Sequence, residues 1–522
     1  MSLTIPIEPL YIVDIFQKAG FDIYIVGGAV RDLLLQAKNK QKNNFNFDFD
    51  FTTNATPEQI QKLLPDSFYE NEFGTVAIAD DQLRTQMGLA LKMSDSLIRE
   101  KIIDLSQATK LHSSLSPKND EDQEKIDKPN FEITTYRSDE VYANHRQPES
   151  LKWGETITQD LSRRDFTINA MALKIDQSFI SSLFTHHNSM PPESVTISES
   201  DYALIDLFAG INDLDQGIIK TVGVAKQRFE EDALRMLRAI RFCVQLNMQI
   251  DDDTFAAIIE KKELLKHISL ERISEELLKI LKSDYPAEGI HLLDQTGLLT
   301  FIIPELLEGK GVQQGGHHDS DVWTHSLDSL RHCPSADPIV RLATLLHDIG
   351  KPATYQIIND NITFYNHEIV GSRIAKNIAL RLKFSKKEVD RIFLLVRFHM
   401  FYYQPQNTDA SIRRFMRKVG LENIDNILAL REGDRLGSGA RKTSWRLEEM
   451  KQRMVEQLHQ PLDVTDLKVN GHDLMDTFQL KPGPILGKIL NYLFEKILDE
   501  PSLNQKEKLL EIAKEYLGEE KS

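Results

Sequence analysis

Two aspartates stand two residues apart in a run that alternates with phenylalanine, Phe45-Asn46-Phe47-Asp48-Phe49-Asp50-Phe51. Successive side chains of a β-strand point to opposite faces, so the phenylalanines share a buried face and Asp48 and Asp50 share the other. Two carboxylates at this spacing repel each other unless a cation lies between them. Their oxygens suit Mg²⁺, which completes its coordination with phosphates. The run therefore predicts a magnesium site; the alternative is a half-exposed strand with solvated carboxylates.

A glycine pair precedes this run and separates two predicted elements. Residues 21–26 are typical of a strand and residues 29–35 of the start of a helix, with Gly27 and Gly28 between them. Such a turn lets a phosphate approach backbone N–H groups at the positive end of the helix. Gly-Gly-x-x-Arg-Asp, which includes Arg31, followed by Asp-x-Asp indicates the head of a nucleotidyltransferase.

Residues 160–173 combine adjacent arginines with acids. Arg163 and Arg164 directly precede Asp165. Arginine suits phosphate because its guanidinium group presents forked donors, so this segment could grip a triphosphate and a ribose. The alternative is a set of ion pairs on the protein surface.

Residues 228–242 have the period of a helix. Asp232, Arg235 and Arg238 follow one another at i, i+3 and i+6, which places them near one stripe of that helix. An aspartate and an arginine on neighbouring turns present an acceptor and several donors, and such a pair can read the edge of a base. A plain ion pair along the helix is the alternative.

Metal-ligand residue types recur downstream in the order His…His-Asp…His…His…Asp. These residues are His325, His347, Asp348, His367, His399 and Asp434. Histidine and aspartate ligands gathered from several helices suit a metal-activated water. Any one of these histidines alone is more often structural, whereas the ordered series indicates a metal centre.

The elements that must position these residues change along the chain. Mixed α/β sequence runs to residue 222 and contains two inserted segments, 81–130 and 176–202, the second predicted to be a loop. Helical periodicity dominates from there onward. We predict a head at 1–222, and the other three parts are a helical neck at 223–310, a metal-binding domain at 311–440 and a helical tail at 441–522.

Composition narrows the class of protein. The chain has 522 residues, no apolar run near the roughly 18 residues of a membrane helix, and no secretory signal at its start. Two cysteines provide no disulfide framework, so we expect a reduced, cytoplasmic protein with no membrane partner. The net charge of −16 by itself argues against nucleic acid, but residues 371–418 hold twelve Lys and Arg against three acids, and local patches decide binding. A solvated helix surface is the alternative reading of that basic run.

As an ordered set, the glycine, Asp-x-Asp, Arg-Arg-Asp and Glu-Asp-Ala-Leu-Arg motifs resemble the class II tRNA nucleotidyltransferase/bacterial poly(A) polymerase family. The resemblance covers residues 20–80, 131–175 and 203–310. It implies an α/β nucleotidyltransferase head, with a mixed sheet and flanking helices, followed by a mostly α-helical neck, HD domain and tail.

The resemblance also implies roles for the residues of the head. Asp48 and Asp50 would hold catalytic Mg²⁺, and Glu132, on a predicted strand, is a candidate third carboxylate. The residues implied to bind the nucleotide are Gly27, Gly28 and Arg31 near its triphosphate, Arg163 and Asp165, and Asp232, Arg235 and Arg238, of which Asp232 and Arg235 act as a protein template for the base.

The downstream series resembles the HD phosphohydrolase domain found at the C-terminus of some bacterial members of the family. The implied ligands of a divalent metal, whose identity stays open, are His325, His347, Asp348 and Asp434, with His367 and His399 for a second ion or a phosphate.

The implied function is template-independent addition of C, C and A to the tRNA 3′ end from CTP and ATP. A bacterial poly(A) polymerase is one alternative, disfavoured because residues 72–76 lack the extra arginines of that branch. Residues 135–148 resemble the loop that switches from C to A, which argues against an enzyme that adds only C. Two further alternatives are an HD phosphohydrolase with an RNA-binding remnant of the head and a noncatalytic tRNA-binding protein. Both are disfavoured because the head keeps its carboxylates.

Overall fold

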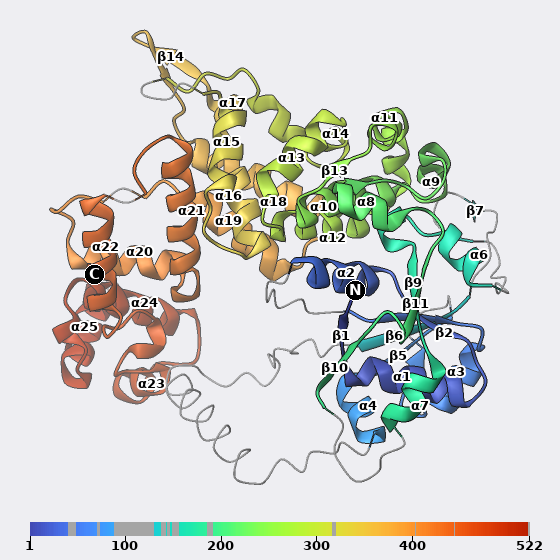
Figure 1. The fold of residues 1–522 in the computed structure, drawn as a ribbon. Helices are drawn as coiled ribbons and strands as arrows, with labels where there is room; N and C mark the ends of the chain where they lie inside the picture. The colour runs from blue at the N-terminus through green and yellow to red at the C-terminus, as the bar shows by residue number, and fades with distance from the viewer. Residues whose placement is uncertain are drawn as a thin grey trace. The chain divides into compact units, whose positions relative to one another are not determined.

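The computed structural model divides into two compact units, Met1–His267 and Ile268–Ser522 (Figure 1). It describes residues 1–39, 48–69, 74–87, 130–136, 142–143, 147–148, 156–184, 192–315, 320–401, 403–442 and 444–519. Phe45, Phe47, residues 72–73 and most of the segments 81–130 and 135–148 lie outside that description. The four-part division predicted from sequence stays a prediction.

A mixed sheet forms the centre of the first unit. Its strands, in spatial order, are β11 (Tyr202–Asp206), β9 (Met171–Ile175), β2 (Ile23–Val26), β3 (Asp50–Thr53), β6 (Asn130–Thr135), β5 (Thr75–Ala79) and β4 (Phe68–Tyr69). Only the β3–β6 pair is parallel among these neighbours. The predicted mixed sheet with flanking helices is confirmed.

Helices pack against this sheet and continue to the end of the unit. They are α1 (Ile7–Lys18), α2 (Gly28–Asn39), α3 (Pro57–Leu63), α4 (Asp80–Gln86), α6 (Ile157–Ser162), α7 (Gln177–Phe184), α8 (Gly210–Gln216), α9 (Ala225–Glu231), α10 (Leu234–Leu246) and α11 (Asp252–Lys261). Helices α3 and α6 each begin with a capping box, in which a threonine and a glutamine satisfy each other's backbone N–H groups.

Two local expectations differ from the structure. Strand β3 begins at Asp50, so Asp48 lies just before the strand rather than within it. The predicted loop 176–202 contains α7 and strand β10 (Ser194–Ile197), which pairs with β1 (Leu3–Pro6). Helix α7 is ordered because Ile180 is buried and Phe184 packs on Tyr11 of α1, with ring centroids 5.7 Å apart.

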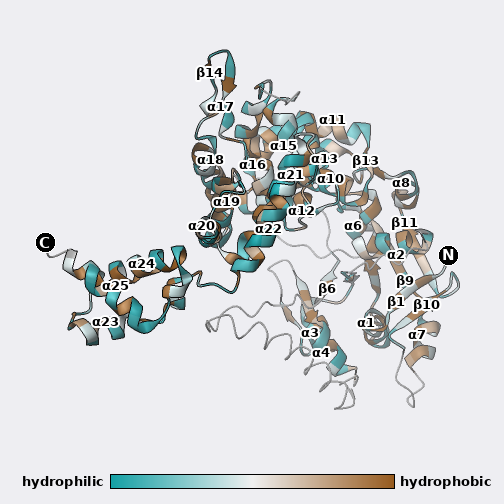
Figure 2. Ribbon diagram, turned by 90° about the vertical axis from the view of Figure 1, so that its left-hand side faces the viewer, coloured by the Kyte–Doolittle hydropathy of each residue, from teal (hydrophilic) through white to brown (hydrophobic). Residues whose placement is uncertain are grey.

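The second unit is almost entirely helical, as predicted. Its helices are α12 (Leu270–Lys282), α13 (Pro286–Gln295), α14 (Leu299–Ile302), α15 (Val322–Arg331), α16 (Pro338–Leu346), α17 (Lys351–Thr354), α18 (His367–Arg381), α19 (Lys386–Phe398), α20 (Asp409–Val419), α21 (Ile424–Gly437), α22 (Trp445–Gln457), α23 (Gly471–Phe478), α24 (Pro484–Asp499) and α25 (Lys506–Glu519). A hairpin of β14 (Gln356–Ile358) and β15 (Asn361–Thr363) follows α17. Apolar and polar residues lie on different sides of α24 and α25 (Figure 2), and their apolar residues form a buried core with α23. No helix within the described ranges is long and apolar enough to cross a membrane.

Candidate functional site

The predicted carboxylates of the head meet at neighbouring strands. Asp50 of β3 lies opposite Glu132 of β6 in the parallel register, so the two side chains share one face of the sheet. Phe49 and Phe51 are buried, whereas Asp48 is exposed and Asp50 half-buried. The predicted alternation therefore holds from residue 48 to residue 51.

The glycine turn lies directly against this carboxylate pair. Gly27 has a φ of +74°, a backbone conformation that residues other than glycine rarely adopt. A Cβ atom at Gly27 would lie 3.0 Å from Arg164 Nη1 and 3.5 Å from Asp50 Oδ2. Helix α2 starts at Gly28, so a carboxylate, a guanidinium group and the positive end of a helix converge at one turn.

Arg31 is fixed by two partners rather than left to solvent. Its Nε and Nη2 donate to the two oxygens of Asp32 at 2.7 and 3.1 Å, and its Nη1 donates to Asn169 Oδ1 at 2.8 Å. Only 8% of Arg31 is exposed. A cation held this rigidly loses little further side-chain entropy when an anion binds.

Buried Asp165 and half-buried Arg238 form an ion pair between two segments far apart in sequence. Arg238 Nε donates to Asp165 Oδ2 at 2.7 Å, and the backbone N–H of Phe166 donates to Asp165 Oδ1 at 2.8 Å. Burial raises the pKa of Asp165, but the Arg238 guanidinium outweighs burial and lowers that pKa to about 2, from an ordinary value of 3.8. The pair joins the 160–173 segment to α10.

This pair makes the stability of the fold depend on pH. Because the pKa of Asp165 is depressed in the folded state, its contribution is present above pH 4 and lost as the pH falls toward 2. We expect Asp165→Asn to cost about 2 kcal/mol of unfolding free energy at pH 7 and progressively less toward pH 2. Urea unfolding at a series of pH values measures this difference. Asp253→Asn, at an exposed carboxylate of α11, is the control, and an equal pH dependence in both variants would contradict the assignment.

The predicted helix over residues 228–242 is broken at Asp232. Helix α9 ends at Glu231 and α10 begins at Leu234, because the backbone of Asp232 is extended and its carboxylate accepts the N–H of Leu234 at 3.0 Å. Asp232, Arg235 and Arg238 therefore do not form one helical stripe.

Arg235 contacts three acceptors of the first unit. It donates to Glu231 Oε2 at 2.6 Å, to the carbonyl of Arg228 at 3.2 Å and to the carbonyl of Arg163 at 3.0 Å. The structure thus brings Arg163, Asp165, Arg235 and Arg238 together, with Asp232 at the helix break beside them.

Two further residues of this network, Asn169 and Phe242, were not singled out from the sequence, whereas Arg164 was named with Arg163. Asn169 bonds both Arg31 and Asp165, and Arg164 lies against Gly27 and binds Asp160 at 3.1 Å. The ring of Phe242 lies 5.4 Å from the guanidinium carbons of Arg31 and Arg238. Asn169 stands four residues after Asp165, a spacing that could have pointed to it.

Close helix contacts in the second unit bring the downstream histidines together. A Cβ atom at Gly433 or Gly437 would lie 2.6 Å from backbone atoms of Ser329, so only glycine lets α21 approach α15 this closely. A Cβ atom at Gly350 would lie 2.2 Å from the carbonyl of His367. Gly433 and Gly437 flank Asp434, and Gly350 follows Asp348. The close packing that these glycines allow therefore brings the candidate metal ligands together.

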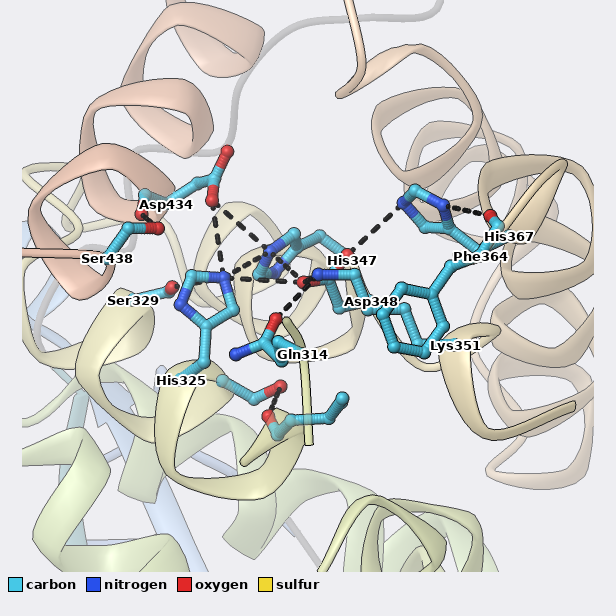
Figure 3. Close-up of polar contacts among 12 residues, drawn as sticks. Gln314, His325, Ser329, His347, Asp348, Lys351, Phe364, His367, Asp434 and Ser438 are labelled. Atoms are coloured by element: carbon cyan, nitrogen blue, oxygen red, sulfur yellow. Dashed lines mark hydrogen bonds and ion pairs between the residues drawn. The ribbon is translucent and has the colours of Figure 1, made fainter. Parts of the chain in front are cut away.

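Asp348 lies between two groups of these ligands (Figure 3). Its Oδ2 is 3.3 Å from His325 Nε2 and 3.2 Å from His347 Nε2, and Asp434 Oδ1 is 3.3 Å from His325 Nε2. The other oxygen of Asp348, Oδ1, is 3.3 Å from His367 Nε2. His399 Nε2 lies 3.3 Å from His367 Nε2 and 3.7 Å from Asp348 Oδ1. One carboxylate thus faces a different set of imidazoles with each oxygen.

Second contacts orient three of the imidazoles. The Nδ1 atoms of His347, His367 and His399 lie 2.7, 2.9 and 2.8 Å from the carbonyls of Thr344, Phe364 and Val396. An Nδ1–H that donates to a carbonyl leaves Nε2 as the acceptor, and this tautomer suits metal binding. Two groups of ligand atoms, His325/His347/Asp348 and Asp348/His367/His399, are compact enough to hold a metal ion among the described residues.

Cations surround Asp348. Lys351 Nζ lies 2.6 Å from Asp348 Oδ2 and also 2.6 Å from Gln314 Oε1 (Figure 3). Burial lowers the pKa of His347, but Asp348 and then Asp434 raise it to about 10. Burial raises the pKa of Asp348, but His347 and Lys351 outweigh it and hold that pKa well below its ordinary value. A bound divalent cation would take over the charge that the His347 proton supplies.

The basic run 371–418 does not form one free surface. Six of its twelve basic residues contact acceptors in the same unit: Arg381 pairs with Glu305, Arg391 with Asp337, Arg397 with Glu368, Arg414 with Asp499, Arg417 with Glu495, and buried Arg413 donates to the carbonyl of Leu498. Five of the twelve positive charges are therefore paired with carboxylates.

Comparisons with known proteins identify the family. Residues 23–120 and 100–220 match the family model described as the poly A polymerase head domain, residues 369–513 match that of tRNA nucleotidyltransferase domain 2, and residues 247–309 match a third model, for a segment of polymerase A. The A-adding tRNA nucleotidyltransferase of Deinococcus radiodurans is 31% identical over 369 residues, which is 68% of this chain and 78% of that protein. This chain belongs to the tRNA nucleotidyltransferase/poly(A) polymerase family.

Other relatives of the family match over the whole chain. The CCA-adding enzyme of Ligilactobacillus salivarius is 28% identical over 522 residues, 98% of this chain and 97% of that protein. The crystal structure of the Bacillus stearothermophilus CCA-adding enzyme in complex with CTP superposes with a TM-score of 0.62 at 24% identity over 98% of both chains. The predicted family and fold class are confirmed, whereas the resemblance to an HD domain stays a prediction.

Proposed function

We propose that this tRNA nucleotidyltransferase adds C, C and A to the 3′ end of tRNA, from CTP and ATP and without a nucleic-acid template. The observation that carries the proposal is the register pair Asp50–Glu132 beside the Gly27 turn, because it joins carboxylates to a phosphate-binding helix end. The printed names of the relatives, A-adding and CCA-adding, support tRNA as the acceptor.

The carboxylates fit divalent metal ions. Asp50 and Glu132 face the same side of the sheet and Asp48 is exposed two residues away, so oxygen ligands for Mg²⁺ lie close together. Two Mg²⁺ ions held by Asp48 and Asp50, with Glu132 as a third ligand, would stabilise charge on the attacking 3′-oxygen and the leaving pyrophosphate.

The other residues of the head would bind and orient the nucleotide. Arg31, which Asp32 and Asn169 fix, and Arg164 at the Gly27 turn would bind the triphosphate together with the N–H groups of α2. Fixing the α-phosphate in line with the tRNA 3′-hydroxyl lowers the entropic part of the barrier. Arg163, Asp165 and Arg238 complete the nucleotide site around the segment that carries the base readers.

We assign reading of the base to Asp232 and Arg235. An Arg235→Ala variant is expected to change the relative incorporation of CTP, ATP, UTP and GTP, by about 1–3 kcal/mol of discrimination, more than it weakens triphosphate binding. Single-nucleotide incorporation with each of the four triphosphates measures those ratios.

Arg228 provides the matched control for Arg235. It contacts the same carboxylate, with Nη2 2.8 Å from Glu231 Oε1, and its Nη1 donates to the carbonyl of Ser162 at 3.2 Å. Arg228→Ala should lower activity without changing the ratios, because it removes the supporting contacts with Glu231 and Ser162 and no group that is assigned to the base. Unchanged ratios in Arg235→Ala as well would make Arg235 a structural residue.

Stepwise incorporation tests the proposed function against its rivals. The protein is given tRNA that lacks the whole CCA end, or that ends after its first or its second C, with CTP or ATP supplied singly. We expect two additions of C followed by one of A. A long A tail would identify a poly(A) polymerase, and addition of A alone to the last substrate would restrict the chain to the final step.

We propose metal-dependent hydrolysis of a phosphoester as a second function, at the histidine–aspartate cluster around Asp348. The supporting observation is that each oxygen of Asp348 faces a separate group of imidazoles. Two ions at such positions could activate a water and bind the phosphate together. His325, His347, Asp348 and Asp434 would hold the first ion, and His367 and His399 the second.

We further propose a cytoplasmic location. Cys243 and Cys333 are both free thiols, a state that a reducing compartment maintains. The proposed substrates, tRNA and nucleoside triphosphates, are found in that compartment. Fractionation of the source cells would test this assignment, and recovery outside the cytoplasm would reject it.

A further inference from the structure

A pocket of about 200 Å³ in the second unit combines aromatic rings with guanidinium groups. We call it the aromatic–arginine pocket, and define it by Phe401, Tyr403, Arg431, Arg435, Trp445 and Arg446. Phe401 and Tyr403 follow helix α19, the first two arginines belong to α21, and Trp445 and Arg446 begin α22. The described residues that line it include no carboxylate.

The arginines of the pocket keep donors for a ligand. Arg435 donates from Nη2 to the carbonyl of Arg441 at 3.1 Å, but its buried Nε has no hydrogen-bond partner within the described chain. A buried N–H without an acceptor is destabilising, so a ligand oxygen that accepts from it would stabilise the pocket. Arg446 is exposed and lies over the ring of Trp445, 5.2 Å from its centroid.

This arrangement differs from the basic run on α19 and α20. There, Arg414 and Arg417 are paired with Glu495 across to α24. Among the residues that the structure describes, Arg431 is the one arginine of the pocket with a carboxylate partner, Asp434, at 2.6 Å. Positive charge therefore remains available in the pocket, where the aromatic rings are, and less so along the basic run.

The aromatic rings provide a surface for stacking. Trp445 is 62% exposed, an unusual state for the largest apolar side chain at the edge of a pocket. The guanidinium carbon of Arg431 lies 5.9 Å from the ring centroid of Phe401, within reach of a cation–π contact. Planar bases stack on such rings and on arginine, while the phosphate accepts from forked N–H donors.

We propose that the aromatic–arginine pocket binds one nucleotide, with its base stacked on Trp445 and its phosphate bound by Arg435 and Arg446. Its volume is below the 300–1,000 Å³ typical of sites for whole small molecules, so it admits one planar group and not a complete triphosphate. This site is distinct in sequence and residues from the nucleotide site of the head. The ligand is a free mononucleotide or one nucleotide of a single-stranded RNA.

Tryptophan fluorescence of the full chain tests the proposal, because stacking of a base quenches the indole of Trp445. The probes are AMP, adenosine, ribose 5-phosphate and a six-nucleotide RNA, each titrated into the parent chain and into Trp445→Leu. Only the quenching that Trp445→Leu abolishes is attributed to the pocket, so binding of AMP to the head does not confuse the result. We expect this Trp445-dependent quenching with AMP and with RNA. It should be weaker with adenosine and absent with ribose 5-phosphate.

Arginine variants then assign the phosphate. Arg435→Gln and Arg446→Gln should each weaken AMP binding by about 5- to 150-fold while adenosine binding changes little. Arg373→Gln, at an exposed arginine of α18, is the matched control and should leave the AMP titration unchanged. Arg446 is exposed, so its variant keeps the test valid if Arg435→Gln unfolds in a thermal melt.

The comparison of AMP with RNA separates the two sources of the nucleotide. Equal affinities would assign a free mononucleotide, and tighter, strongly salt-dependent binding of RNA would assign a polynucleotide. No Trp445-dependent quenching, or equal affinity for AMP and adenosine in every variant, would overturn the proposal. Tighter binding of an acidic peptide than of either nucleotide probe would overturn it in favour of a protein partner.

Discussion

Asp50→Asn is expected to slow nucleotide incorporation by about 100- to 1,000-fold while the fold remains intact. The carboxylate of Asp50 lies beside Glu132 and against the Gly27 turn, where the proposed Mg²⁺ ions and the triphosphate would meet. Removing one group that stabilises charge in a transition state typically costs about 2.7–4 kcal/mol, and asparagine keeps the shape while losing the charge. Primer-style incorporation of CTP into tRNA at saturating Mg²⁺ measures the rate.

Asp22→Asn provides the control for this variant. Asp22 precedes the same sheet strand, β2, that pairs with β3, but it is exposed and binds Lys174 at 3.2 Å on the surface. We expect Asp22→Asn to change the rate of incorporation by less than about twofold, as is usual for a surface substitution. Asp48→Asn should resemble Asp50→Asn. Near-normal incorporation by both Asp48→Asn and Asp50→Asn would rule out the assignment of two Mg²⁺ ions to these carboxylates.

The sequence predicted this strand because one face of it is apolar. Period-2 alternation specifies which residues share a face, and Phe49, Asp50 and Phe51 lie as that pattern requires. Alternation says nothing about the neighbouring strand, so the register between Asp50 and Glu132 could not be derived from it. Glu132 could only be suggested, since pairing between segments 82 residues apart depends on the whole sheet.

The base-reading segment shows where helical periodicity misleads. Residues 228–242 fit a helix by spacing, yet the chain turns at Asp232 because that side chain binds the N–H of Leu234. Aspartate competes with helical hydrogen bonds through such local contacts, and an Asp within a periodic run signals a possible break. The partners of Arg235 also depend on Arg163, which reaches it only through tertiary packing.

The order of the downstream histidines predicted one cluster, and the structure gathers all of them around Asp348. What the residue order could not reveal is the role of the glycines. Gly350 and Gly433 have no chemistry of their own, but they allow the contacts between α18 and the Asp348 turn, and between α21 and α15. Lys351 and Gln314 were likewise missed, because their contact with Asp348 is a matter of packing.

Asp348→Asn is expected to abolish metal-dependent hydrolysis at the histidine–aspartate cluster while leaving nucleotide incorporation by the head nearly unchanged. Each oxygen of Asp348 serves one group of imidazoles, so its loss should weaken metal binding by at least about 100-fold. The assay is hydrolysis of bis(p-nitrophenyl) phosphate with Mg²⁺, Mn²⁺ or Zn²⁺, alongside CTP incorporation by the same preparation. Asp328→Asn, at a half-buried carboxylate of α15 paired with Arg331, should change neither activity.

Stability must be separated from chemistry in this variant. Asp348 is buried and 13% of the Lys351 side chain is exposed. Removing one partner of a buried ion pair costs about 3–5 kcal/mol because the other charge is left unpaired. The double variant Asp348→Asn/Lys351→Gln removes that unpaired charge and should regain thermal stability without regaining hydrolysis. Hydrolysis that survives in the stable double variant would reject Asp348 as a catalytic ligand. Loss of both activities in a chain that melts at the parent temperature would show that the two centres are not separable.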